Sequence, residues 1–402
     1  MTATHYTLDT FPAGRPGGRP FDLPAEYRRM FGEHRVPFVL LPTGKPAHLV
    51  GRYADVRAVL AGPVSADGQL PGFPMAREGS RPGSGTLSFF RMDAPDHRKY
   101  RKLTTGSFTL ARVAALRPML EQAVAGLIGE LLRKEPPVDL VEDFALPVPS
   151  LMICQILGVP YADRQHFQGL SNILTRGPQY GREAFRQAAG ELRAYIVALA
   201  GRKRDAPGDD LLSGLIGRFT EDPGLDPEQL AAIVLLLLVA GHETTASMIS
   251  LGMLALLTDR DQLKVLTSDD SVNTADAVEE LLRYISIAQW IPRVAAQDLE
   301  LDGYRIRRGD GLIALPMMAN RDSEVFASPD QLDLRRPGVP HIAFGFGPHQ
   351  CLGLQLARME LQVVYRALAL AIPGLRLAVP AGQLRFRQQA AIYGIDELPV
   401  TW

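Results

Sequence analysis

The chain has 402 residues and a mass of 44.0 kDa, with 46% hydrophobic and 22% charged residues. This composition is typical of a globular protein and excludes a disordered tail or a fibrous protein. Because the formal net charge is −1, no overall basic character points to nucleic acid or an anionic membrane, and we expect neither partner.

In chain order, a strand is predicted at His48–Val50 and a Pro/Gly-rich loop at Ala61–Gly85, long enough for a functional loop. Helical periodicity then dominates. The predicted helices are Ala111–Leu132, Ala184–Arg204, Pro227–Leu257, Thr274–Tyr284 and Leu352–Leu370. Further strands are predicted at Leu299–Leu301, Tyr304–Ile306, Gly311–Leu315 and Leu384–Phe386. Since no repeat or low-complexity linker divides the chain, we predict one mainly α domain over residues 1–402 with a small β-rich portion.

The two cysteines, Cys154 and Cys351, indicate the cellular compartment. They form no Cys-x-x-Cys pair, which excludes zinc ribbons and thioredoxin-like motifs. So few thiols in a long chain indicate a reducing environment. No signal peptide is predicted at the N-terminus, and the longest apolar run, Leu230–Ala240, is too short to span a bilayer. We therefore expect a cytoplasmic monomer without a membrane anchor.

The helix predicted from Pro227 carries polar residues in its middle. Asp226 is a candidate N-cap, Pro227 suits the first helical position, and Gln229 occupies the capping-box position. The apolar pattern breaks at Gly241–Thr245 and resumes at Met248. Buried polar groups are costly unless they are partnered. The break marks either a surface exposure or a functional site, and the return of apolar residues favours the site.

A second glycine-rich segment precedes the last predicted helix. Gly345, Gly347 and Gly353 surround Cys351, and glycine permits tight turns and close backbone approach. A cysteine at a helix N-terminus has its thiolate stabilised by the helix dipole. These residues alone leave two alternatives, a nucleophilic cysteine or a metal-bound thiolate. Cys154 lies in an apolar helical segment, so we interpret it as a core residue.

Four segments together resemble the cytochrome P450 family of haem-thiolate monooxygenases. Residues 344–353 match its haem-binding signature, Phe-Gly-x-Gly-x-His-x-Cys-x-Gly. Residues 240–245 resemble its oxygen-activating segment, residues 280–283 its Glu-x-x-Arg motif, and residues 92–101 the start of a helix that contacts a haem propionate. The resemblance extends from about Phe21 to Trp402. It implies the P450 fold, with haem b between the long central helix and the helix that follows the cysteine loop.

The resemblance also implies a role for each matching residue. Cys351 would be the axial thiolate of the haem iron, a ligand that favours O–O cleavage, and Phe344 would shield its sulfur. Arginine suits the haem propionates because its fork is bidentate. The other haem contacts implied by position are His97, Arg101, Ala240, Arg293, Gly345, His349 and Gly353. Arg98, Lys99 and Lys102 would face solvent, either as a plain basic surface or as part of a docking face.

Glu243 and Thr244 resemble the acid–alcohol pair that delivers protons during oxygen activation. Gly241 would let the helix widen locally and leave room for O2. Glu280 and Arg283 resemble a buried structural ion pair, which fixes geometry more than it adds stability. One departure from the family is Leu332, which stands where a Phe-Asp-x-x-Arg pattern commonly has its aromatic residue.

The implied function is a soluble bacterial monooxygenase that inserts one oxygen atom of O2 into an organic substrate. Electrons would come from NAD(P)H through a ferredoxin reductase and a ferredoxin. The first 120 residues carry 17 Lys and Arg against 9 Asp and Glu, an excess that suits an acidic ferredoxin or a solvated surface equally well. Two alternatives are a peroxide-driven peroxygenase, disfavoured by Glu243–Thr244, and a catalytically silent binding protein, disfavoured also by Cys351.

The composition of the expected pocket gives the substrate class. By position, a mostly apolar set should line the distal side of the haem and suit a sizeable hydrophobic molecule such as a polyketide or terpenoid. The alternative for each of these residues is an ordinary place in the core. The sequence leaves both hydroxylation and epoxidation open as the reaction. The set is Leu87, Phe89, Leu236, Val239, Ala240, Ala288, Gln289, Ile291 and Ile392.

Overall fold

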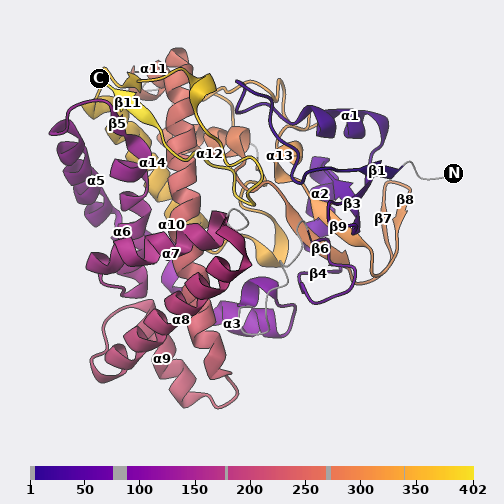
Figure 1. The fold of residues 1–402 in the computed structure, drawn as a ribbon, viewed down its shortest axis with the longest axis horizontal. Helices are drawn as coiled ribbons and strands as arrows, with labels where there is room; N and C mark the ends of the chain where they lie inside the picture. Colours follow the sequence, from indigo (N-terminus) through magenta and orange to yellow (C-terminus); the bar gives the residue numbers. More distant parts are fainter. Residues whose placement is uncertain (1–4, 76–87, 177–179, 269–272, 339) are drawn as a thin grey trace.

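The computed structural model describes residues 5–75, 88–176, 180–268, 273–338 and 340–402. A helical body lies beside a smaller β-rich part, and one long helix, α10 (Pro227–Thr258), runs through the helical body (Figure 1). The expectation of a mainly α fold with a small β portion is confirmed.

The described helices are spread over the whole chain. The α-helices are α1 (Ala25–Glu33), α2 (Tyr53–Ala61), α3 (Asp96–Thr105), α4 (Leu110–Ala115), α5 (Arg117–Leu132), α6 (Pro147–Leu157), α7 (Arg164–Arg176), α8 (Gly181–Asp205), α9 (Leu211–Glu221), α10, α11 (Arg260–Ser268), α12 (Thr274–Ile285), α13 (Pro316–Ala319) and α14 (Leu354–Ala371). Short 3-10 segments are η1 (Phe89–Arg91), η2 (Gly106–Phe108), η4 (Tyr161–Asp163), η6 (Gly347–His349) and η7 (Ala381–Gln383), and η3 (Val141–Ala145) is π-helical.

One predicted helix, Ala111–Leu132, is two helices. The chain breaks between α4 and α5, and Pro118 lies in the first turn of α5. Proline lacks an N–H donor and its ring clashes with the carbonyl four residues earlier, so it begins a helix more readily than it continues one. The other four predicted helices correspond to α8, α10, α12 and α14.

The strands form three sheets. They are β1 (His5–Thr7), β2 (Phe38–Leu40), β3 (Pro46–Val50), β4 (Val64–Ser65), β5 (Val138–Asp139), β6 (Ile291–Ala295), β7 (Leu299–Leu301), β8 (Tyr304–Ile306), β9 (Gly311–Ala314), β10 (Arg376–Leu377) and β11 (Pro399–Thr401). The largest sheet has the order β1-β2-β3-β9-β6-β4, the second β10-β11-β5, and β7 pairs with β8. In the largest sheet β3 and β9 are parallel, with His48 opposite Leu312.

Two strand and loop predictions need correction. The strand predicted at Leu384–Phe386 is a single bridge from Phe386 to Ile395, because Gln388 N–H donates to the Phe386 carbonyl and turns the chain. The loop predicted at Ala61–Gly85 contains β4, and its residues 76–85 lie outside the described part of the chain.

Helices cover both faces of the largest sheet. Neighbouring strand residues point to opposite faces, so Leu49 packs with Met30 of α1 whereas Val50 packs with Val56 of α2. The sheet brings β6, late in the sequence, beside β4 near the N-terminus, and so joins distant segments at one edge of the helical body.

The start of α10 is fixed by Asp226, whose carboxylate accepts the Glu228 N–H at 3.0 Å, which confirms the predicted N-cap. A capping box with Gln229 does not form, since the Asp226 N–H donates to the Tyr100 hydroxyl at 3.3 Å. Within the described residues, α10 alone is long and apolar enough to cross a membrane, but 67% of its apolar window is buried inside the protein, as in the core helix of a soluble domain.

Candidate active site

The middle of α10 is open along one stripe. Ala240 is exposed, and Leu236, Val239 and Thr244 are half-buried, whereas His242 and its neighbours on the other faces are buried. Residues four apart share a helix face, so 236, 240 and 244 lie in one line. The Thr244 hydroxyl donates to the Ala240 carbonyl at 2.7 Å, which leaves its oxygen free to accept. An open stripe midway along a core helix borders accessible space inside the protein.

Gly241 faces the neighbouring helix α6. A Cβ atom there would lie 2.7 Å from two side-chain carbons of Ile153, so glycine is needed for this close approach. The helix stays α-helical through Gly241. The predicted local widening is therefore wrong, and this glycine serves helix packing.

Glu243 is buried and ion-paired. Its carboxylate lies 3.2 Å from Nη1 of Arg387, and Nη2 of Arg387 donates to the Ile395 carbonyl at 3.0 Å. The two charged residues are 144 positions apart, and no local pattern links them. Sequence reasoning named Glu243 but missed the arginine that holds it.

The cysteine loop is shaped by glycine. Gly345 and Gly347 have φ angles of +70° and +74°, which side chains rarely adopt. A Cβ atom on Gly347 would also lie 2.4 Å from the Leu60 carbonyl of α2. The Cys351 N–H donates to the Phe344 carbonyl at 2.9 Å and closes the loop. The loop thus delivers Cys351 to the N-terminal end of α14.

Cys351 lies where a ligand could reach it. Its side chain is exposed, yet burial raises the pKa of the thiol, while a hydrogen bond from the Gly353 N–H and the charges of Arg101 and Arg358 act in the opposite direction. A side chain that is accessible and yet lies deep inside the protein is expected on the wall of an internal cavity, so Cys351 fits such a position. Arg358 also stacks over the Phe344 ring, 5.0 Å from its centre.

Four basic side chains gather beside this loop. His97 and Arg101 come from α3, Arg293 from β6 and His349 from η6. The rings of His97 and His349 are 4.0 Å apart, and Arg101 Nη2 donates to the Gln350 carbonyl at 2.6 Å. Burial, followed by the charges of Arg293, His97, Arg101 and Arg91, lowers the pKa of His349 to about 3, so this histidine is a neutral donor at pH 7.

The carboxylates in the described part of the chain do not neutralise this group of cations. No ion pair to Arg101 or Arg293 is present among the described residues, and His97 Nε2 is shielded from solvent without a hydrogen-bond partner there. Asp93 is the carboxylate that raises the pKa of Arg293, but it already accepts from Ser65 and from the Ala66 N–H. Unpaired buried cations are costly. The site fits a ligand that brings carboxylates, as the two propionates of haem would.

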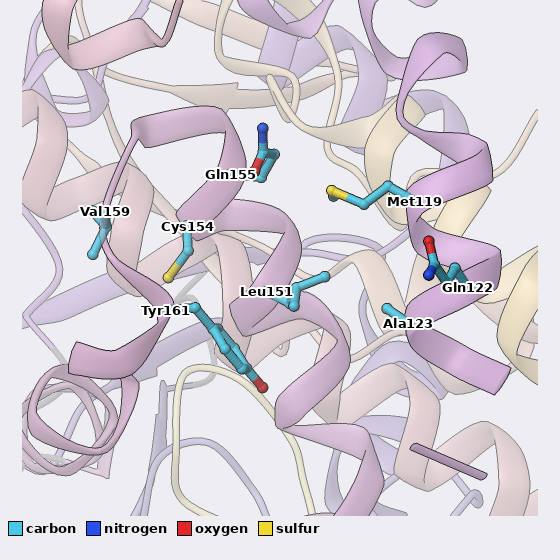
Figure 2. A pocket seen from close by; sticks show the side chains of 8 residues that line it. All are labelled: Met119, Gln122, Ala123, Leu151, Cys154, Gln155, Val159 and Tyr161. Atoms are coloured by element: carbon cyan, nitrogen blue, oxygen red, sulfur yellow. The ribbon is translucent and has the colours of Figure 1, made fainter. Parts of the chain in front are cut away.

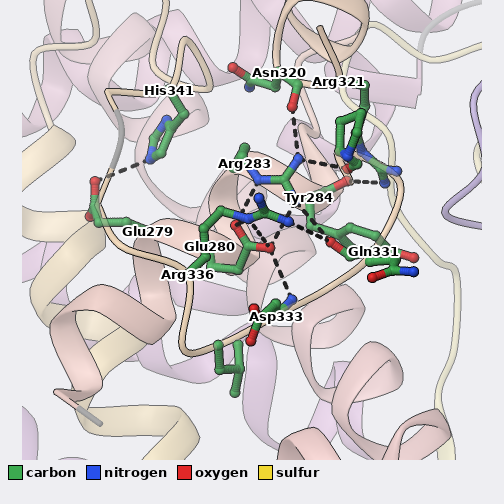
Figure 3. A network of polar contacts seen from close by, with 12 residues as sticks. Glu279, Glu280, Arg283, Tyr284, Asn320, Arg321, Gln331, Asp333, Arg336 and His341 are labelled. Atoms are coloured by element: carbon green, nitrogen blue, oxygen red, sulfur yellow. Dashed lines mark hydrogen bonds and ion pairs between the residues drawn. The ribbon is translucent and has the colours of Figure 1, made fainter. Parts of the chain in front are cut away.

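A second polar cluster joins α12 to the segments around Asn320 and Gln331 (Figure 3). Glu280 and Arg283 form a buried two-pronged ion pair with contacts of 2.6 and 2.8 Å. Arg336 Nε lies 3.1 Å from the same carboxylate, and the Asp333 N–H donates to it at 3.0 Å. The segment with the leucine departure therefore still docks here, and Leu332 packs partly buried against the core.

The expected pocket residues divide into two groups. Leu236, Val239, Ala240, Ala288, Ile291 and Ile392 are half-buried or exposed, and Ala288 bridges to Ile392. Phe89 is buried in the core. Gln289 is fully buried, and its amide donates to the carbonyls of Gln388 and Ala390 at 2.8 Å. The Gln289 oxygen has no hydrogen-bond partner among the described residues, so a place in the pocket stays a prediction for Phe89 and Gln289. Leu87 lies outside the described residues.

Cys154 has a different environment from Cys351. It is buried on α6, and burial raises the pKa of its thiol to about 12. It borders a cavity of about 360 Å³ between α5 and α6 that no residue of α10 or of the cysteine loop lines (Figure 2). The other lining residues are Met119, Gln122, Ala123, Leu151, Gln155, Val159 and Tyr161. This cavity is separate from the site on α10.

Comparisons with known proteins agree with the geometry. Residues 181–369 match the sequence model of the cytochrome P450 family. The chain is 43% identical to cytochrome P450-SOY of Streptomyces griseus over 98% of this chain and 95% of that protein. It is 42% identical to the pentalenic acid synthase of Streptomyces avermitilis over 95% of both.

The fold also matches solved structures. The mycinamicin VIII C21 methyl hydroxylase of Micromonospora griseorubida, crystallised with mycinamicin VIII bound, superposes with a TM-score of 0.92 at 36% identity. The match covers 99% of this chain and all of that one. The chain belongs to the cytochrome P450 family of monooxygenases, which use haem and O2.

Proposed function

We propose that this monooxygenase is a cytoplasmic, ferredoxin-dependent enzyme that oxidises a large hydrophobic specialised metabolite. One observation carries the haem-dependent core of the proposal: the accessible Cys351 of the haem-loop motif stands beside buried cations that lack ion-pair partners in the described part of the chain. When bound, haem would supply the redox centre for activating O2 and oxidising the substrate.

In this proposal Cys351 supplies the thiolate ligand. The Gly353 N–H and the nearby charges of Arg101 and Arg358 stabilise its negative charge, since hydrogen bonds to a ligand atom tune a metal centre. Phe344, with Arg358 stacked over it, shields the sulfur from water. His97, Arg101, Arg293 and His349 would hold the propionates, and Ala240 and Gly345 would contact the haem.

Proton delivery is assigned to Thr244 and Glu243. The Thr244 hydroxyl donates to Ala240, so its oxygen can accept a hydrogen bond from a water near the reacting oxygen. Glu243 lies next in the chain, and its carboxylate can pass protons once it parts from Arg387, 3.2 Å away. Arg387 is thus a positioning residue that holds the relay carboxylate in the interior.

The substrate class follows from the open stripe on α10. Its side chains at 236, 239 and 240 are apolar, and Ile291 and Ile392 extend the apolar wall. Relatives of similar identity are named for pentalenic acid and for mycinamicin VIII. Because those names differ, they support oxidation of a specialised metabolite such as a terpenoid or polyketide, and not one particular substrate.

The docking site of the electron donor is assigned to the basic face of α3. Arg98, Lys99 and Lys102 are exposed on this helix, while His97 on its opposite side is buried. Lys99 also donates to the Gly224 carbonyl, which leaves Arg98 and Lys102 as the better docking cations. Complementary charge with an acidic ferredoxin would speed the encounter.

Turnover of candidate metabolites tests the proposal. The purified enzyme is given NADPH, a ferredoxin and its reductase, or hydrogen peroxide alone, and oxidised product is measured by mass spectrometry. We expect product with O2 and ferredoxin and little with peroxide. Product with peroxide alone would indicate a peroxygenase. A substrate-induced spectral shift without product in either arm would indicate a silent binding protein.

A further inference from the structure

Arg91 is a third arginine at the edge of the cation group, and none of the family motifs includes it. It ends η1, just before α3. Its guanidinium carbon lies 4.8 Å from the centre of the Phe73 ring and 5.0 Å from that of Phe90. Stacking covers the faces of a guanidinium, but its five N–H donors point outward in the plane and still need acceptors.

At least one nitrogen of this guanidinium has no acceptor in the described part of the protein. Nη1 of Arg91 is shielded from solvent and has no hydrogen-bond partner among the described residues. A buried donor without an acceptor is costly, and more so when it is charged. The two rings therefore fix the guanidinium in place without meeting its hydrogen-bonding needs.

The charges around Arg91 are positive. Burial and then the charge of Arg293 lower the pKa of Arg91 to about 10. Arg91 and Arg293 thus lie close enough for their charges to act on one another, although they come from η1 and β6. Among the described carboxylates, none raises the pKa of Arg91.

We propose that Arg91 is a carboxylate-binding residue of the active site. Two sources can supply that carboxylate: a haem propionate, or an acid group on the bound substrate. The inference rests on the proposed haem site and extends it, because three guanidinium groups rather than two would then receive anions there. Arginine suits this task since its fork meets both oxygens of a carboxylate.

The first arm of the test measures haem retention. In the holoenzyme, Arg91→Gln removes the charge and keeps a polar side chain, and haem transfer to an excess of apomyoglobin is followed optically. If a propionate is the ligand, transfer becomes about tenfold faster than in wild type. The matched control is Arg164→Gln, because Arg164 is also half-buried and stacks on a ring, that of Tyr161, 4.6 Å away.

The second arm measures ligand affinity by optical titration with dodecanoate and with dodecanamide. If the substrate supplies the carboxylate, Arg91→Gln leaves haem transfer unchanged but weakens dodecanoate binding about tenfold relative to the amide. Arg91→Lys keeps the charge but loses the two-pronged geometry, so its haem-transfer rate or dodecanoate affinity should lie between those of wild type and Arg91→Gln. This variant replaces Arg91→Gln in both arms if Arg91→Gln misfolds.

The outcomes are separable. If both arms of Arg91→Gln match wild type and the Arg164→Gln control, the inference is overturned while the proposed function stands. If the wild-type protein itself takes up no haem, the proposed function fails first. A change in either arm alone supports carboxylate binding and identifies its source.

Discussion

Arg283 and Arg293 lie ten residues apart in the sequence and are both almost fully buried, 2% and 4% exposed. Arg283 meets both oxygens of Glu280 and three backbone carbonyls. Arg293 donates to the carbonyl of its own neighbour, Pro292, and has no ion pair among the described residues. A buried cation whose partners all come from the chain holds the fold together, whereas one left incomplete indicates a place for a ligand.

The largest loss of stability is expected at Arg283, whose hydrogen-bond partners all come from the protein. Arg283→Met leaves the Glu280 carboxylate buried with fewer partners, and breaking a buried pair costs about 3–5 kcal/mol. We expect the free energy of unfolding of the apoprotein to fall by that order, measured by urea denaturation. A loss below about 1 kcal/mol would show that the network is not needed for the fold.

Glu360 in α14 is a buried carboxylate that has no ion pair with an arginine among the described residues. Burial raises the pKa of Glu360 in α14 from 4.5 to about 8, and the Thr245 hydroxyl only partly offsets this. Between those two pH values the folded state holds a proton that the unfolded state has released, so stability falls as pH rises, by about 1 kcal/mol per pH unit.

The measurement is the free energy of unfolding from pH 5 to pH 8. Glu360→Gln should flatten this dependence, because the amide does not titrate. The control is Glu121→Gln on the exposed face of α5, which should keep the wild-type slope. An equal slope in wild type and Glu360→Gln would assign the pH dependence to other groups.

Removing Arg293, whose charge has no ion-pair partner among the described residues, should not destabilise the apoprotein as removing Arg283 does. Arg293→Gln removes a buried cation that has no ion-pair partner in the described part of the apoprotein, so we expect the free energy of unfolding without haem to stay equal or rise. Haem affinity should fall roughly ten- to a hundredfold, since a hydrogen bond to a charged group contributes about 1.5–3 kcal/mol. Apoprotein destabilised as strongly as by Arg283→Met would remove the distinction between the two arginines.

The smallest effect is expected at the exposed cations of α3. Replacing Arg98 and Lys102 with Glu should slow ferredoxin-supported reduction a few-fold at low ionic strength, because rim charges act mainly on encounter rates and are screened by salt. Stopped-flow reduction at several salt concentrations measures this. The same double reversal at Arg182 and Arg186 on α8 is the control. Equal rates and salt slopes in both double variants would exclude α3 from the docking face.

The sequence predicted best those groups whose partners are near in the chain. Glu280 and Arg283 are three residues apart on one helix, and the loop around Cys351 is contiguous, so spacing and family motifs were sufficient. Arg387 and Arg91 were missed because their contacts depend on how distant segments pack. The contacts of Gln289 were missed for the same reason: its amide N–H groups donate to two carbonyls about a hundred residues later, and no local pattern reveals them.

The most direct measurement is the carbon monoxide difference spectrum of the reduced protein in three forms. Cys154 is the matched control, because it is a buried thiol whose pKa burial raises to about 12, which makes it unsuitable as a thiolate ligand at pH 7. Wild type and Cys154→Ser should both give the carbonyl band of a haem thiolate, and Cys351→Ser should lose it while remaining folded by circular dichroism. A Cys351→Ser protein that retains the thiolate band would contradict the assignment of Cys351 and with it the proposed site.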